Sequence, residues 1–294
     1  MEKFLEYLEE KRKKIDNSIE NILPPPEIYP SSLHQAMRYG VLNGGKRIRP
    51  ILTIAVSEIT GGKEEPAMIA GTSIELIHCA SLILDDLPCM DNSVLRRGKE
   101  TCHRVFGEDI AILAAFGLLN MGYYLLATLK EKGVKDKIVV NLMKRFNDAI
   151  GTDGLLAGQT VDLESNSKNI TSEIIDYIYN KKTASLFVAA AEFGSILSEI
   201  NKKEMFSILR YARDIGLAFQ IKDDILDAEG DIKKLGKEIK KDLKKTTHVS
   251  LFGVEKSKEK VKELINSAIN HINQFGKKAE LLINLAKFIE IRET

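Results

Sequence analysis

The apolar residues of this chain recur at the spacing of amphipathic helices. In the segment 4–22 they lie three, four or seven positions apart, which places them on one face of a helix. The prolines at 24–26 end this first helix, because proline interrupts the helical hydrogen-bond ladder. A second helix is predicted from the candidate caps Ser31 and Ser32 to the Gly44-Gly45 pair. Further helices are predicted at about 50–60, 66–87, 108–131, 136–161, 172–180, 183–198, 202–227, 256–274 and 278–292.

The pattern predicts no β-hairpin. No segment alternates apolar and polar residues up to a two-residue turn of the Asn-Gly type. The connections between the predicted helices are short, and no Pro/Gly/Ser-rich linker separates them. We therefore expect one all-α domain over residues 1–294, built as a large helical bundle around a core cavity, since bundles hold metals and ligands between facing helices.

One predicted helix is apolar nearly all round. The segment 110–129 has no charged residue and is long enough to span a membrane, for which about 20 residues suffice. It stands alone among amphipathic helices, and it contains Asn120 and two glycines. We expect it to be a buried helix or a subunit interface rather than a membrane span.

The overall composition points to no charged partner. Forty-three basic residues nearly cancel 42 acidic ones, so the net charge of +1 gives no reason to expect nucleic acid. Cys79, Cys89 and Cys102 are odd in number and lack C-x-x-C spacing, which favours a reducing compartment. The first 20 residues are charged and have no apolar signal-peptide core. We expect a cytoplasmic protein.

Aspartates cluster at two places, each after an apolar helical turn. The first cluster contains Asp85, Asp86 and Asp91, and the second contains Asp223, Asp224 and Asp227. Asp223 and Asp227 are four residues apart in a helix, so their side chains project from one face and repel each other unless a cation lies nearby. Pro88 interrupts the helical spacing of the first cluster, and a bulge there would bring Asp91 round to face Asp85.

Carboxylate oxygens without Cys or His are typical ligands of Mg²⁺, which completes its shell with water and substrate phosphates. A single cluster of this kind is equally compatible with an acidic, solvated helix end. Its recurrence, at helix ends where negative charge opposes the macrodipole, favours a metal site.

Basic residues that could bind phosphate lie near these clusters. Lys46, Arg47 and Arg49 follow the Gly44-Gly45 pair, and arginine offers a planar fork that matches phosphate oxygens. The spacing is not that of a Walker loop. His78 lies two helical turns before Asp85. Taken one at a time, a solvated basic turn and a buried core histidine are the simpler explanations.

The motifs taken together resemble the polyprenyl synthase family. In the family's order, they cover the chain from about residue 33 to 249: Gly44–Pro50, Asp85–Gly98, Gly158-Gln159 with Asp162-Leu163, Lys182-Thr183, and Phe219-Gln220 with Asp223, Asp224 and Asp227. The resemblance implies an all-α bundle of the isoprenoid-synthase type, usually homodimeric and Mg²⁺-dependent, with a deep central cavity between its two aspartate motifs.

The resemblance also implies a role for each matching residue. The Mg²⁺ ligands, which could bind Mn²⁺ instead, would be Asp85, Asp91 and Asp223, joined directly or through water by Asp86, Asp224 and Asp227. The allylic diphosphate would be bound by Arg96, Lys182, Thr183, Gln220 and Lys237. Isopentenyl diphosphate would be bound by Lys46, Arg49, His78 and Arg97. The expected catalytic set is Asp85, Asp86, Asp91, Arg96, Lys182, Asp223 and Asp224.

The sequence departs from the family pattern at a few positions, none of which is a proposed metal ligand. Leu84 stands where His often precedes the first motif, and Asn92-Ser93-Val94 replaces a more acidic stretch. Lys240 occupies a usual Gly position, and His248 replaces a common Tyr.

The spacing of the first motif indicates a short-chain synthase. The spread from Asp85 to Asp91 resembles bacterial farnesyl and bacterial or plant geranylgeranyl diphosphate synthases. Similar bacterial farnesyl synthases tend to carry Tyr five residues before the first Asp, where this chain has Ala80. Ala80 and Ser81 are both small, which predicts geranylgeranyl diphosphate (C20) as the product, with farnesyl diphosphate (C15) as the alternative. The expected substrates are isopentenyl diphosphate with dimethylallyl, geranyl and farnesyl diphosphates.

Two other all-α proteins compete with this interpretation. A class I terpene cyclase also binds Mg²⁺ with aspartates, but it needs no second substrate site of the kind that Lys46, Arg49 and His78 suggest. A non-catalytic synthase subunit would be expected to lose motif aspartates, and this chain keeps both sets.

Overall fold

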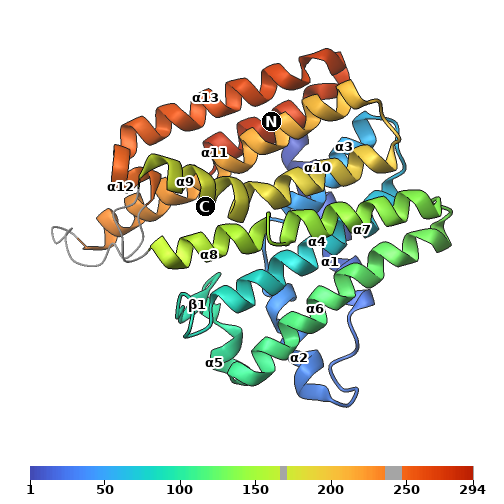
Figure 1. The fold of residues 1–294 in the computed structure, drawn as a ribbon, viewed down its shortest axis with the longest axis vertical. Coiled ribbons are helices and arrows are strands. Elements are labelled where there is room, and N and C mark those ends of the chain that lie inside the picture. The colour runs from blue at the N-terminus through green and yellow to red at the C-terminus, as the bar shows by residue number, and fades with distance from the viewer. Residues whose placement is uncertain (166–170, 236–246, 294) are drawn as a thin grey trace. The chain divides into compact units, whose positions relative to one another are not determined.

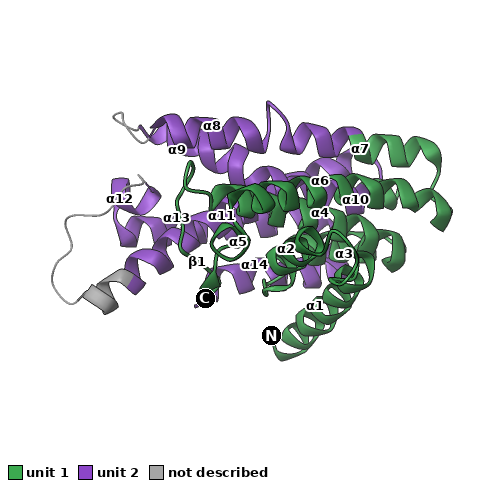
Figure 2. Cartoon of the chain, turned by 90° about the horizontal axis from the view of Figure 1, so that it is seen from below, with its two compact units in different colours: residues 1–143, 196–199 green, residues 144–195, 200–294 purple. Residues whose placement is uncertain are grey.

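The computed structural model describes residues 1–165, 171–235 and 247–293 (Figure 1). The chain divides into two compact units, residues 1–143 with 196–199 and residues 144–195 with 200–294 (Figure 2). We call them unit 1 and unit 2 and describe each by itself. The predictions of one domain and of a deep central cavity therefore stay predictions.

Unit 1 is formed mainly by helices from the first half of the chain. Its elements are α1 (Glu2–Ile22), α2 (Ser31–Leu42), α3 (Ile48–Ile59), α4 (Glu64–Asp85), β1 (Leu95–Arg96), β2 (Lys99–Glu100), α5 (Cys102–Phe106), α6 (Glu108–Thr128), the 3₁₀-helix η1 (Leu129–Lys132) and the first half of α7 (Asp136–Ile150). The elements predicted from the apolar periodicity are present, and the all-α fold class is confirmed.

Helix α4 packs between α3 and α6 in unit 1, and glycines allow both contacts to be close. A Cβ added at Gly71 would lie 2.9 Å from the Cα of Pro50 in α3. A Cβ at Gly122 of α6 would lie 3.0 Å from Ile77 Cγ1 of α4. Any larger residue at these two positions would push the helices apart. These contacts fix the position of α4, whose C-terminal end carries the first aspartate cluster.

Helix α6 buries only one of its faces. Ala111, Ala114 and Leu118 are fully buried, whereas Leu113, Phe116 and Tyr124 are 53%, 62% and 61% exposed. Two helical stretches in the described residues, α4 and Glu108–Lys132, are long and apolar enough to span a membrane, and 67% and 39% of their apolar windows are buried. Such helices are weak evidence for a membrane span, because core helices pass the same test.

The structure contains a small β-hairpin, so the prediction that the chain has none was wrong. Leu95 pairs with Glu100, and Arg96 pairs with Lys99. Arg97 and Gly98 form the two-residue turn with φ values of 54° and 77°, the left-handed conformation that such turns require. Strands of two residues are too short to show an alternating pattern, and Arg-Gly here takes the place of the usual Asn-Gly.

Unit 2 is formed by the remaining helices. Its elements are the second half of α7, α8 (Leu155–Ser165), α9 (Ser172–Ile178), the π-helical turn η2 (Tyr179–Ala184), most of α10 (Ser185–Leu197), α11 (Lys202–Leu235), α12 (His248–Phe252), α13 (Val254–Ile272), the 3₁₀-helix η3 (Asn273–Ala279) and α14 (Glu280–Ile291). Helix α11, the longest of these, packs along α13 and also contacts α14 and η2.

Three predicted helix boundaries in this half of the chain differ from the structure. Helix α11 continues from the predicted end at residue 227 to Leu235, so the second aspartate cluster lies inside a helix and the prediction that it lies at a helix end was wrong. The helix predicted over 136–161 is divided at residues 151–154, where Gly151 and Gly154 form a turn closed by a 2.9 Å backbone hydrogen bond. The two helices predicted at 172–180 and 183–198 are joined by η2 without a break. A π-helical turn inserts an extra residue and often marks a functional site.

Candidate active site

The first aspartate cluster lies where α4 ends in unit 1. The chain turns back after Leu87, and the backbone N–H of Asp91 donates to the carbonyl oxygen of Asp85 at 2.9 Å. The N–H of Ser93 also donates to the carbonyl of Asp86 at 3.2 Å. The backbones of Asp85 and Asp91 are thus adjacent, as the expected bulge at Pro88 requires.

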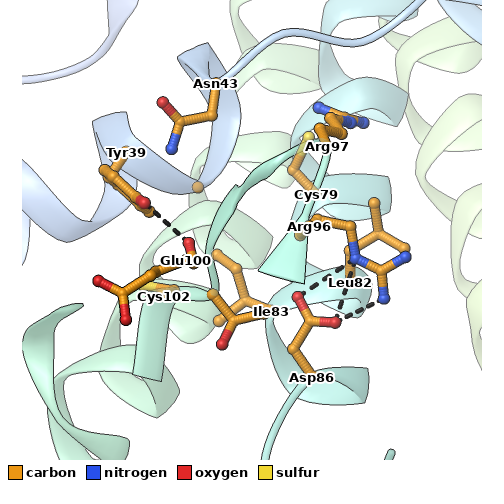
Figure 3. Close-up of a pocket in the computed structure, with 12 residues that line it drawn as sticks. Tyr39, Asn43, Cys79, Leu82, Ile83, Asp86, Arg96, Arg97, Glu100 and Cys102 are labelled. Atoms are coloured by element: carbon orange, nitrogen blue, oxygen red, sulfur yellow. Dashed lines mark hydrogen bonds and ion pairs between the residues drawn. The ribbon is translucent and has the colours of Figure 1, made fainter. Parts of the chain in front are cut away.

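Asp86 is buried and its carboxylate is held by Arg96 from the hairpin (Figure 3). Arg96 Nε lies 3.1 Å and Nη2 lies 2.5 Å from Asp86 Oδ1. A guanidinium fork of this kind gives a strong, oriented interaction. Asp86 therefore fixes Arg96, a predicted ligand of the allylic diphosphate, and its own role as a metal ligand stays a prediction.

The basic segment 46–49 contains residues with different surroundings. Arg47 is buried, with a φ of 52°, and its guanidinium donates to Asp16 Oδ1 and Glu75 Oε1, both at 2.8 Å, and to the carbonyl of Val41 at 2.7 Å. The side chains of Arg47 and Glu75 are 1% and 3% exposed. Arg47 was a candidate phosphate ligand by its place in the sequence, and Glu75 was not predicted as a site residue. The structure instead makes their ion pair the anchor of this segment.

Arg49 and His78, both predicted to bind isopentenyl diphosphate, contact each other. Arg49 Nη1 lies 3.1 Å from His78 Nε2. Burial, followed by the positive charges of Arg49 and Arg97, lowers the pKa of His78 well below its ordinary value. The imidazole is therefore neutral, and its Nε2 accepts the hydrogen bond that orients the Arg49 guanidinium.

The hairpin attaches Arg97 to the glycine pair before the basic segment. Arg97 Nη1 donates to the carbonyl of Gly44, and a Cβ at Gly45 would lie 2.9 Å from that nitrogen. Tyr39 of α2 and Asn43, the residue after α2, also hold the hairpin. The Tyr39 hydroxyl donates to the carbonyl of Glu100 at 2.7 Å (Figure 3), and Lys99 Nζ donates to Asn43 Oδ1 at 3.0 Å.

The unit 1 cluster therefore consists of the first aspartates and the basic residues that the hairpin brings beside the glycine loop. Tyr39, Cys79 and Ile83 line a pocket together with Asp86 and Arg96. Four residues that are predicted to bind diphosphate belong to this unit: Lys46, Arg49, His78 and Arg97. Arg49 contacts His78, and Arg97 contacts Gly44, two residues before Lys46.

The second aspartate cluster lies on α11 in unit 2, where Asp223 contacts a residue near the C-terminus. Arg292 Nη2 lies 2.6 Å from Asp223 Oδ1 and donates to the carbonyl of Phe219 at 2.8 Å. The Arg292 side chain is buried, and that of Asp223 is 39% exposed. Arg292 belongs to none of the sequence motifs, so it was not predicted as a site residue.

Asp224 is buried and receives hydrogen bonds on both carboxylate oxygens. The Tyr179 hydroxyl donates to Oδ2, and Gln220 Nε2 donates to Oδ1 at 3.1 Å. Burial raises the pKa of Asp224 to about 6, although the hydrogen bonds from Tyr179 and Gln220 oppose this shift. Thr183 Oγ1 in turn donates to Gln220 Oε1 at 2.7 Å. This sequence of bonds links η2 to the second aspartate cluster.

Lys182 is also presented by η2, and it pairs with a residue of the Gly158–Leu163 motif. Its Nζ lies 2.7 Å from Asp162 Oδ2. A Cβ at Gly158 would lie 2.3 Å from the backbone nitrogen of Lys182, so only glycine allows α8 to approach the turn this closely. Both amide atoms of the neighbouring Gln159 are buried without a hydrogen-bond partner among the described residues.

The unit 2 cluster thus brings together Lys182, Thr183, Gln220, Asp223 and Asp224, whereas Asp227 lies one turn further along α11 and is exposed. Lys237 and Lys240 lie outside the described residues.

The donor set of both clusters suits Mg²⁺. In the described part of the chain, no three side chains of His, Cys, Asp or Glu converge as a preformed cage. Mg²⁺ does not need such a cage, because it is usually bound by one or two carboxylates together with water and substrate phosphates. The carboxylates of Asp85, Asp91, Asp223 and Asp227 provide this kind of oxygen ligand.

The residues predicted to limit chain length occupy different positions on α4. Ala80 belongs to the hydrophobic core of unit 1 and is 4% exposed. Ser81 is half-buried, lies four residues before Asp85 on the same face of α4, and donates to the carbonyl of His78 at 2.8 Å. On α6, Phe116 is 62% exposed, whereas Met121 packs against the core.

Comparison with known proteins agrees with the order of these motifs. The family model described as polyprenyl synthetase matches residues 30–285. The chain is 42% identical to geranylgeranyl pyrophosphate synthase 4 of Arabidopsis thaliana, over 98% of this chain and 78% of that protein. It is 41% identical to geranylgeranyl diphosphate synthase of Cyanophora paradoxa, over 97% and 95% of the two chains.

A solved structure of an FPP/GFPP synthase from Zymomonas mobilis is similar along its whole length. Its TM-score is 0.88 at 35% identity, covering 98% of this chain and 99% of that chain. The match of the family model over most of the sequence and the near-complete coverage of these relatives lead to one conclusion. The chain belongs to the polyprenyl synthetase family.

Proposed function

We propose that this protein is a prenyltransferase that joins isopentenyl diphosphate to allylic diphosphates with Mg²⁺ and produces geranylgeranyl diphosphate. One observation carries the proposal. Each unit holds an aspartate cluster next to cations that are fixed by protein contacts: Arg96 by Asp86 in unit 1 and Lys182 by Asp162 in unit 2. Paired carboxylates and cations suit a metal-bound diphosphate, and family membership supports the substrate class.

The allylic diphosphate would be bound by the ordered cations and hydroxyl groups near the aspartates. Mg²⁺, held by Asp85, Asp91 and Asp223, would neutralise the charge that develops on the departing diphosphate. Arg96 and Lys182 would each add positive charge beside the aspartates of their own unit, with orientations set in advance by Asp86 and Asp162. Such preorganisation lowers the reorganisation that charge separation requires.

Isopentenyl diphosphate would be bound by the basic residues of unit 1. Neutral His78 orients Arg49, and the contact of Arg97 with Gly44 places a second guanidinium beside the same loop. Loss of diphosphate from the allylic substrate leaves a cation, which the isopentenyl double bond attacks, and a proton is then lost. No described side chain in either cluster is an obvious base, and the released diphosphate is the expected acceptor.

The proposed product is C20, in line with the names of the plant and algal relatives. Ser81 and Ala80, four and five residues before Asp85, both have small side chains. The C15 product is the second candidate, because the similar solved structure is named an FPP/GFPP synthase.

A homodimer in the cytoplasm is the proposed working form. Leu113, Phe116 and Tyr124 are exposed large apolar side chains along α6. A second copy of the chain would cover these side chains, because exposed apolar residues that lie together mark interaction surfaces. Charge substitution at Phe116 should then yield monomers in analytical ultracentrifugation.

The experiment that tests the proposed function is a product assay. The protein is incubated with radiolabelled isopentenyl diphosphate, each allylic primer and Mg²⁺, and the chain length of the products is determined. We expect C20 from every primer, and Asp85→Asn and Asp223→Asn should each lower kcat by orders of magnitude while keeping the fold. A cyclic hydrocarbon formed without isopentenyl diphosphate would identify a terpene cyclase. No turnover by the wild type would indicate a non-catalytic subunit.

A further inference from the structure

Tyr179 is a buried tyrosine whose hydroxyl group joins two distant segments of unit 2. It is the first residue of η2, and only 7% of its surface is exposed. Its O–H donates to Asp224 Oδ2, and its oxygen accepts the backbone N–H of His248 at 2.9 Å. Both hydrogen-bonding capacities of the phenol are therefore used, one by the second aspartate cluster and one by the start of α12.

His248 is itself fixed in this position. Its ring Nδ1 lies 2.8 Å from Ser257 Oγ on α13, and Thr247 caps α12 through reciprocal bonds with Ser250. The backbone N–H that Tyr179 accepts from His248 therefore belongs to an ordered helix start. Because a tyrosine hydroxyl has one hydrogen, accepting the N–H of His248 leaves that hydrogen directed at Asp224.

The bond from Tyr179 has consequences for the residues beyond Asp224. A carboxylate only accepts hydrogen bonds, so Gln220 must turn its amide nitrogen to Asp224 and its amide oxygen to Thr183. The observed distances are 3.1 Å from Gln220 Nε2 to Asp224 Oδ1 and 2.7 Å from Thr183 Oγ1 to Gln220 Oε1. The orientation of both proposed substrate ligands thus depends on where Asp224 is held.

We propose that Tyr179 is a positioning residue for prenyl transfer, which holds Asp224 so that Asp224 orients Gln220 and, through it, Thr183. The proposal rests on the proposed function and deepens it at one site. It also assigns Asp224 to orienting its neighbours rather than to binding the metal directly. In agreement with this, Asp224 is buried between two protein donors, whereas Asp223 is 39% exposed and Asp227 is exposed.

Tyr179→Phe tests the proposal, because it keeps the ring and removes only the hydroxyl. We expect kcat to fall by about 10- to 100-fold, the range for losing one orienting hydrogen bond at a buried site, while KM for isopentenyl diphosphate stays within about twofold. Mn²⁺ binding, measured by the free-ion signal in electron paramagnetic resonance, should also stay within about twofold. A tenfold loss of Mn²⁺ affinity would overturn the proposal by assigning Asp224 to the metal.

Tyr211→Phe is the matched control. Tyr211 is fully buried in the same unit, and its hydroxyl donates to the carbonyl of Leu282 at 2.7 Å, whereas the second aspartate cluster begins twelve residues further along α11. Both variants should lower the melting temperature, but only Tyr179→Phe should lower kcat. If the two variants lose stability and keep kcat alike, Tyr179 is an ordinary core residue and the proposal fails.

A double-mutant cycle tests whether Tyr179 acts through Gln220. In a Gln220→Leu background, Tyr179→Phe should change kcat by less than about threefold, since the group that it orients is gone. Multiplicative losses in the double variant would contradict the proposal. Asp224→Asn is the second single variant, in case Tyr179→Phe does not fold, and it should lower kcat without weakening Mn²⁺ binding. These tests require an active wild type, so an inactive wild type refutes the proposed function and active variants refute only this inference.

Discussion

Replacing Arg47 tests whether this residue anchors the basic segment 46–49 or binds a ligand. The sequence places Lys46, Arg47 and Arg49 within four positions. The guanidinium of Arg47 is buried and lies 2.8 Å from both Asp16 and Glu75. The charged group of Glu75 is buried as well. Each member of the Arg47–Glu75 pair therefore neutralises a charge that would otherwise be buried alone.

The expected cost of Arg47→Met follows from this burial. Removing one partner of a buried ion pair costs about 3–5 kcal/mol, because the remaining charge stays in a medium of low dielectric constant. The bond to Asp16 adds little, since that side chain is 32% exposed and exposed pairs contribute below about 1 kcal/mol. We expect the free energy of unfolding to fall by about 4 kcal/mol. Adding Glu75→Gln should restore on the order of 2 kcal/mol, because no unpaired charge then remains.

The assay is urea denaturation followed by circular dichroism, together with KM for both substrates under conditions where the variant is folded. Arg12→Met is the matched control, because Arg12 forms an exposed pair with Glu9 on α1 and should change stability by less than about 1 kcal/mol. An Arg47→Met protein as stable as the wild type but with a raised KM for isopentenyl diphosphate would show that Arg47 is a ligand contact, and the reasoning from burial would be wrong.

Three further predictions concern the same cluster. Lys46→Ala and Arg49→Ala should raise KM for isopentenyl diphosphate at least tenfold more than KM for the allylic partner in steady-state assays, and equal effects would argue against separate sites. The pKa of His78 is lower in the folded state than its unfolded value near 6.5. The free energy of unfolding should therefore fall as the pH drops below 6.5, by up to about 1.4 kcal/mol per pH unit. In urea titrations, His78→Asn should make this pH dependence smaller. Ala80→Tyr and Ser81→Phe should both shift the products toward C15. Only Ala80→Tyr should also cost about 1–3 kcal/mol of stability by overpacking the core. An unchanged C20 share in both variants would show that other residues limit the chain length of the product.

Most helices were predictable from the sequence, because apolar residues that recur with a period near 3.6 indicate a helix rather than a strand. The order of the motifs is read directly from the sequence. The hairpin at Leu95–Glu100 was not predictable in this way, since two-residue strands carry no periodic signal. The π-helical turn η2 also escaped prediction. One inserted residue between two apolar helices looks like a short loop, and only the packing of Gly158 against Lys182 explains why the chain continues as a turn there.

The contacts of Arg292 and Tyr179 could not be predicted at all. Their partners Asp223 and Asp224 lie 69 and 45 residues away in the sequence, so the pairing depends on how α14, η2 and α11 pack. Neither residue belongs to a motif, and an arginine near a chain end or a tyrosine in a helix is an ordinary surface or core residue by composition. The sequence would predict these contacts only if it were already known that Asp223 and Asp224 on α11 each need a hydrogen-bond donor.

The two aspartate clusters share an arrangement that follows from helix geometry. Successive side chains on a helix point about 100° apart, so the two members of an Asp-Asp pair cannot face the same direction. In the first pair Asp85 is half-buried and Asp86 is buried against Arg96; in the second Asp223 is half-exposed and Asp224 is buried against Tyr179 and Gln220. The second aspartate of each pair thus points into its own unit, where it meets a donor from a neighbouring element. In each Asp-Asp pair the first carboxylate is thus the more exposed one, although that of Asp223 also contacts Arg292, and the second orients the surrounding side chains.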